Sequence, residues 1–222
     1  VLSIHTLTTN VTGHFAYFAE EVMKQDYAAA FTFFVLTLFF LFGAFTSNFL
    51  AELIAKKYTH LSHVIPISLE MIILLGIGFL GFQTELSSNE GKWIAFSMLF
   101  AMGIQNAMVT KISQSTVRTT HLTGLFTDLG IELSQLFFYK KPEETKKLKT
   151  SIFLRLSIIS FFFIGCVSGG FMYNLLKLTT LFVAVAFLLI ALLYDYIRMQ
   201  FHVIKRIESK EAVPIKIHKN TP

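Results

Sequence analysis

Long stretches without charge constrain this chain more than any other feature. Glu70 is the one charged residue in its run, and Arg155 lies near the end of another. A helix needs about 20 apolar residues to cross the hydrocarbon core of a bilayer. Five runs meet or approach this length: Tyr27–Ala51, Val64–Phe82, Trp93–Val109, Ser151–Tyr173 and Leu178–Tyr194. The sequence therefore predicts an all-α, polytopic transmembrane helical bundle with five spans.

The overall composition excludes several other classes of protein. Only 15% of the residues are charged, whereas soluble domains carry roughly a quarter. The net charge of +5 is better explained by cytosolic loops of a membrane protein than by nucleic-acid binding. The single cysteine, Cys166, lies in an apolar run and is interpreted as packing. The sequence has no spacing typical of a metal site, cofactor or catalytic nucleophile, so we expect none and disfavour an enzyme.

The distribution of Lys and Arg predicts how the spans are oriented. If residues 119–138 do not cross the membrane, every Lys and Arg except Lys24, Lys92 and Lys177 falls on one side. The positive-inside rule then places residues 139–149 and the C-terminal tail in the cytosol and residues 83–92 on the other side.

A polar hexapeptide occurs twice, as TTNVTG at residues 8–13 and as TTHLTG at residues 119–124. Residues 8–22 align with 119–133, and FGAFTSNFL (42–50) loosely matches IGCVSGGFM (164–172) once the insertion YKKPEETKKLK is allowed for. We interpret this as two inverted three-helix repeats, because a unit with an odd number of spans reverses the orientation of the next. The single transmembrane domain, 1–222, would comprise a first repeat at about 1–83 that lacks its first helix, a second at about 92–195, and a basic cytosolic tail, 196–222.

Each hexapeptide precedes apolar residues at helical spacing, so each predicts the start of a short helix. Two arrangements remain open: re-entrant helices that meet near the middle of the membrane, and amphipathic helices in the interface. Helix N-termini carry partial positive charge, which suits a small anionic or polar solute. His14 and His121 flank the two glycines, and Arg118 precedes the second threonine pair.

Several polar residues become candidates for binding such a solute. Glu70 is the strongest candidate, because burying a carboxylate in a membrane is costly and often serves a function. Its alternative role is a structural ion pair with Arg118 or Arg155. Asp128 and Glu132 could bind a cation, but a solvated helix face is the favoured interpretation. The expected substrate-binding set is Thr9, Thr12, Gly13, His14, Glu70, Gln105, Asn106, Arg118, Thr120, Thr123 and Gly124.

The segments AMGIQNAMVTK (101–111), TTHLTGLFTDL (119–129) and TNVTGHF (9–15) together resemble the YoaK-like family of bacterial inner-membrane proteins. The resemblance covers nearly the whole chain and implies a six-helix protein of unassigned function. His14 departs from the family's Thr-Gly-Asn pattern, and no catalytic residue can be carried over.

These observations predict a small-solute transporter or channel in the bacterial inner membrane, with several membrane passes and a cytosolic C-terminus. The expected partners are the lipid bilayer and a small polar or anionic solute, with no nucleic acid, and the oligomeric state is left open. A membrane-embedded enzyme and a non-transporting scaffold or sensor are the alternatives.

Overall fold

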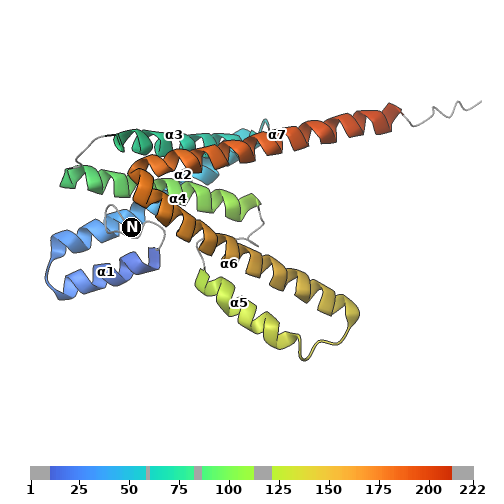
Figure 1. The fold of residues 1–222 in the computed structure, drawn as a ribbon, viewed down its shortest axis with the longest axis horizontal. Helices are drawn as coiled ribbons and strands as arrows, with labels where there is room; N and C mark the ends of the chain where they lie inside the picture. The colour runs from blue at the N-terminus through green and yellow to red at the C-terminus, as the bar shows by residue number, and fades with distance from the viewer. Residues whose placement is uncertain (1–10, 59–60, 83–86, 113–121, 212–222) are drawn as a thin grey trace, which may run out of the picture.

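The computed structural model describes residues 11–58, 61–82, 87–112 and 122–211, and the regular structure in these segments is helical (Figure 1). The all-α prediction is therefore confirmed. The elements follow in the order α1 (Val11–Met23), α2 (Tyr27–Ala55), α3 (Val64–Leu80), α4 (Ser88–Ile112), α5 (Leu122–Gln135), α6 (Pro142–Leu176), the short 3₁₀ helix η2 (Lys177–Thr180) and α7 (Leu181–Glu211).

Each of the five apolar runs lies on one of these helices, but not all of them qualify as separate spans. Within the described residues, three stretches are long and apolar enough to cross a membrane: Tyr27–Ala55, Asn89–Ile112 and Pro142–Gln200. The third contains both α6 and α7, which are divided at Lys177, where a φ of 54° ends α6. Helix α3 is apolar but has only 17 residues.

Helices α2 and α4 form the most extensive helix pair of the described fold. They run parallel, because Phe39 stacks on Phe96 and, further along both helices, Glu52 pairs with Lys111. Two glycines allow the close approach of the two helices. A Cβ added to Gly43 of α2 would overlap the carbonyl of Phe100 on α4. A Cβ added to Gly103 of α4 would overlap the carbonyl of Phe40 on α2. Small residues of this kind let helix backbones pack tightly in membranes.

Helices α3 and α7 complete the packed bundle as an antiparallel pair. Phe182 at the start of α7 lies against Gly78 near the end of α3, and His63 before α3 lies 2.9 Å from Asp195 far along α7. Leu74 of α3 packs with Ala101 of α4 and Val185 of α7. The core of the bundle therefore lies partly where α3, α4 and α7 meet and partly between α2 and α4, where Leu36 packs with Ala95 and Leu99.

Two helical hairpins extend from this bundle. In the first hairpin, α1 packs back along α2. The turn between them passes through Gln25, whose φ is 63°. Asp26 then caps α2, because its side chain accepts a hydrogen bond from the Ala29 amide at 3.0 Å. In the second, α5 packs against α6. Figure 1 shows that the turns of the two hairpins point toward opposite ends of the molecule.

Candidate functional site

Glu70 lies inside the bundle, on the face of α3 that also carries buried Ile67, Leu74 and Ile77. The residue is only 3% exposed, and its Oε2 atom is buried without a hydrogen-bond partner. Leaving a buried polar atom unpaired costs roughly 1–3 kcal/mol, and more for a charged group. Glu70 is therefore enclosed by protein, but it is not among the residues that line the polar cavity described below, and its role in binding a solute stays a prediction.

Arg155, which the sequence offered as a partner for Glu70, pairs with other carboxylates. Its Nε donates to Glu132 Oε2 at 2.9 Å, and a terminal nitrogen donates to Asp128 Oδ2 at 2.8 Å. The Ser151 hydroxyl donates to the second oxygen of Glu132 at 2.6 Å. The interpretation of Asp128 and Glu132 as a solvated helix face was wrong for Glu132, whose side chain is 14% exposed, whereas Asp128 is 52% exposed. The two carboxylates lie four residues apart on α5 and both face Arg155 on α6. These four residues, named the Arg155 clamp below, fasten α5 to α6.

A polar cavity of about 180 Å³ lies where α2 and α4 end and α3 begins. Its polar side chains come from three segments that are far apart in the sequence: Ser47 and Asn48 of α2, Ser62 and His63 before α3, and Lys111 of α4. Lys111 also contacts Glu52 at 2.6 Å, and His63 contacts Asp195 at 2.9 Å. A cavity with hydroxyl, amide, imidazole and ammonium groups can hold water or a small polar or anionic solute.

The sequence did not select most residues of this cavity. Ser47 is 1% exposed but reads in the sequence as one more small residue of an apolar helix. His63 and Lys111 read as interfacial residues at helix ends. The cavity could have been predicted from the polar residues that α2, α3 and α4 each carry at the same end of the bundle. That prediction requires the direction of each helix, which the sequence does not give.

The predicted substrate-binding residues are distributed over several places. In α1, Thr12 is exposed, Gly13 is half-buried, and His14 is completely buried with its ring 6.0 Å from that of Phe33. In α5, Thr123 is exposed and Gly124 is half-buried. The predicted residues Thr9, Arg118 and Thr120, and His121 beside them, lie outside the described residues.

The polar pair on α4 is half-buried. Asn106 donates from its side-chain nitrogen to the Met102 carbonyl of its own helix at 3.1 Å. Neither Gln105 nor Asn106 is among the residues that line the polar cavity, although Ala107 and Met108 are.

The described part of α1 begins at Val11 and that of α5 begins at Leu122, because residues 1–10 and 113–121 lie outside the described residues. The helix starts expected at the two hexapeptides therefore stay predictions. α1 packs on α2, and α5 packs on α6. In Figure 1 the beginnings of α1 (dark blue) and α5 (yellow-green) both lie on the inner side of their hairpins, away from the turns.

The apolar stretches and the packed bundle together define a multi-pass, all-helical membrane protein. Within this class the chain belongs to the family described as protein of unknown function DUF1275, which matches residues 1–194. This match confirms the resemblance to the YoaK-like family. Comparisons with curated proteins and with solved structures found no match to this chain.

Proposed function

We propose that this protein is a small-solute transporter or channel built from two inverted repeats, and that it resides in a bacterial inner membrane with its C-terminus in the cytosol. The observation that carries this proposal is the pair of hairpins whose turns point to opposite ends of the molecule (Figure 1). Inverted repeats with short helices that enter the membrane from opposite sides are typical of secondary transporters.

Contacts at equivalent positions support the repeat. The first sequence match pairs Tyr17 with Asp128, and extending the register of the second match back along α2 and α6 pairs Phe33 with Arg155. The ring of Tyr17 lies 5.3 Å from that of Phe33, and Asp128 lies 2.8 Å from Arg155. The same positions are therefore in contact in both hairpins, through aromatic packing in one and through an ion pair in the other.

Burial agrees at one position of the first sequence match, which pairs His14 with Leu125: these residues are 0% and 5% exposed. The second match, 42–50 with 164–172, does not preserve burial, because Gly43 and Ser47 are buried whereas Gly165 is exposed and Gly169 is half-buried.

The direction of α1 and α5 favours the re-entrant alternative over the interfacial one. Each helix packs along the side of a long apolar helix, whereas an interfacial helix lies flat in the plane of the headgroups. At 1.5 Å per residue, α1 extends about 20 Å back from its turn with α2, which is more than half of a hydrocarbon core of about 30 Å. The Thr-Gly starts would then lie near the middle of the membrane, where their free backbone N–H groups need polar partners.

Glu70 and the polar cavity would supply the rest of the pathway. The cavity opens near the ends of α2 and α4, and Glu70 lies almost two helical turns along α3 from His63, which lines it. Buried carboxylates inside membrane bundles commonly couple the movement of a solute to that of a proton or cation. We assign this coupling role to Glu70 and the binding of a small polar or anionic solute to the region of the two motifs.

Flux through reconstituted protein tests this proposal. Proteoliposomes should take up at least one of labelled phosphate, sulfate or acetate faster than protein-free liposomes, with a rate that depends on pH. Glu70→Gln should remove the pH dependence without changing the elution profile in detergent, because the amide nearly preserves the shape of the side chain. Glu90→Gln is the matched control and should behave like the wild type, because Glu90 lies outside the bundle core at the start of α4, where its carboxylate accepts a hydrogen bond from the Ser87 amide and the glutamine oxygen can do the same.

Two results would contradict the proposal. One is the absence of uptake above protein-free liposomes for these anions and for a set of neutral polar solutes. The other concerns depth: nitroxides attached at Thr12→Cys and Thr123→Cys, each combined with Cys166→Ala, should report positions deep in the hydrocarbon. If both report the headgroup level, the re-entrant arrangement fails.

A further inference from the structure

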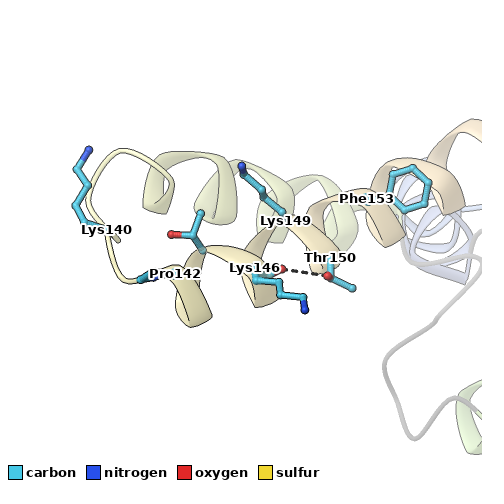
Figure 2. Close-up of a pocket in the computed structure, with 7 residues that line it drawn as sticks. Lys140, Pro142, Lys146, Lys149, Thr150 and Phe153 are labelled. Carbon is cyan, nitrogen blue, oxygen red and sulfur yellow. Dashed lines mark hydrogen bonds between the residues drawn. The ribbon is translucent and has the colours of Figure 1, made fainter.

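A basic groove runs along the first turns of α6, at a distance from the polar cavity described above. It has a volume of about 610 Å³ and is lined by Lys140, Pro142, Thr145, Lys146, Lys149, Thr150 and Phe153. Figure 2 shows Lys140 at one end, Phe153 at the other, and Lys146 and Lys149 between them. The groove is therefore charged along most of its length and apolar at one end.

The charge of the groove is not neutralised by neighbouring carboxylates. Glu143 and Glu144 lie in the same turns of α6 but do not line it, and Glu144 contacts Lys141 at 3.5 Å, which is also outside the lining. Among the described residues, no ion pair involves Lys140, Lys146 or Lys149. Three ammonium groups are thus available to a ligand.

The hydroxyl groups of the groove are already used as donors. Thr145 donates to the carbonyls of Tyr139 and Lys141, and Thr150 donates to the carbonyl of Lys146. Hydrogen-bond donation to a ligand therefore falls to the lysines. Ammonium groups without a competing carboxylate suit a phosphate group better than they suit a neutral sugar or an amide.

The position of the groove along α6 indicates what kind of phosphate it meets. Lys146 and Lys149 lie in the last turns before the apolar run that begins at Ser151, and Phe153, at the apolar end of the groove, is 73% exposed. A ligand that fills this groove has a phosphate and an apolar chain joined end to end. Where α6 enters the bilayer, that description fits a phospholipid whose headgroup carries a net negative charge.

We propose that this groove is a binding site for an anionic phospholipid, which holds the α5–α6 hairpin at the membrane surface. The phosphate lies among Lys140, Lys146 and Lys149, and the first part of an acyl chain lies against Phe153. The site is independent of the transport pathway, so that loss of lipid binding and loss of solute flux are separate outcomes.

A tryptophan placed in the groove can report which lipid occupies it. The only native tryptophan is Trp93, on α4, so Trp93→Phe combined with Phe153→Trp gives a full-length chain with one reporter. The protein is reconstituted in phosphatidylcholine that contains phosphatidylglycerol, with bromine on the acyl chains of one lipid or the other. Brominated phosphatidylglycerol should quench the reporter more strongly than its share of the lipid predicts.

The lysines are then removed one at a time in the reporter background. Lys146→Gln and Lys149→Gln should each lower the preference for phosphatidylglycerol about fivefold. Lys147→Gln removes the same charge from the same turns but outside the groove, and should change the preference less than twofold. A second reporter, Phe171→Trp on the exposed apolar part of α6, should show no preference.

Three outcomes would overturn the proposal. The first is equal quenching by the two lipids at position 153 in the reporter protein. The second is an equal effect of Lys147→Gln and Lys146→Gln, which would mean a diffuse surface potential. The third is loss of the preference when inorganic phosphate is added at constant ionic strength, which would assign the groove to a free anion.

Discussion

At the scale of single residues, the glycines of this protein differ in whether another helix packs against them. Gly43 and Gly103 lie where the backbones of α2 and α4 meet, and neither has room for a Cβ. Gly165 and Gly169 lie on α6, where an added Cβ would meet no atom of another helix within 4 Å. The sequence around Gly43 resembles that around Gly165, so only the contacts distinguish a tightly packed glycine from an open one.

This difference predicts opposite effects of the same substitution. Gly43→Ala should destabilise the protein by about 1–3 kcal/mol, because α2 and α4 must move apart to accept the methyl group. Gly165→Ala should be neutral or stabilising by up to about 1 kcal/mol, since alanine favours the helix over glycine. Thermal or denaturant unfolding in one detergent compares the two variants, and equal destabilisation would contradict the α2–α4 packing.

Surface charge at the turn of the first hairpin contributes little to the pH dependence of the protein's stability. The Lys24 side chain contacts Glu20 at 2.7 Å and Glu21 at 2.9 Å, and hydrogen bonds to these carboxylates raise the pKa of the lysine. A raised lysine pKa contributes stability that is lost only as the pH rises toward and beyond that pKa. Lys24 therefore stays charged throughout the physiological range, and water screens its exposed pairs.

At the scale of elements, the Arg155 clamp decides how α5 is held. Arg155 and Glu132 are mostly shielded, with side-chain exposures of 21% and 14%, whereas Asp128 is 52% exposed. Removing one member leaves a shielded charge without its partner, which costs more than the pair itself contributes. The contact between Tyr17 and Phe33 in the first hairpin is aromatic, so the two hairpins should respond differently to salt.

Arg155→Gln should release α5 while leaving the bundle folded. Hydrogen exchange should rise at least tenfold for amides in Leu122–Gln135 and stay unchanged in α2 and α4, since the clamp joins only α5 with α6. The double variant Arg155→Gln with Glu132→Gln should recover part of the protection, because it removes both charges. If α5 exchange is unaffected in the single variant, apolar packing by Leu125 and Leu129 alone holds the helix.

At the scale of the whole molecule, the helix contacts place chain segments at two ends. The end of α2, the start of α3 and the end of α4 lie together, as the polar cavity and the contact between Glu52 and Lys111 require. The end of α3 and the start of α4 lie with η2 at the other end, where Ile77, Ile94 and Leu178 form one cluster. This grouping agrees with the charge-based assignment of these segments to two sides of the membrane.

Impermeant thiol labelling in whole cells tests the assignment. In a Cys166→Ala background, Lys92→Cys should be labelled from outside, and Lys146→Cys should be labelled only after the membrane is opened. The reason is the excess of Lys and Arg in residues 139–149 and in the tail, which favours retention in the cytosol. Labelling of Lys146→Cys in intact cells would reverse the orientation.

The sequence by itself determined the helical class and the membrane environment. These properties follow from composition and periodicity, which act locally along the chain: long apolar runs must satisfy their own backbone hydrogen bonds in lipid and so form helices. It also singled out Glu70, because a lone carboxylate in an apolar run is visible without any structure.

Only the tertiary structure decided which polar groups meet. Arg155 could have paired with Glu70, but the direction of α5 brings Asp128 and Glu132 to it instead. Ser47, His63 and Lys111 form one cavity because α2 and α4 run parallel and α3 runs against them. Periodicity tells which face of a helix is apolar, but it does not tell which neighbour that face packs against, and the ion pairs and cavities of this protein depend on that choice.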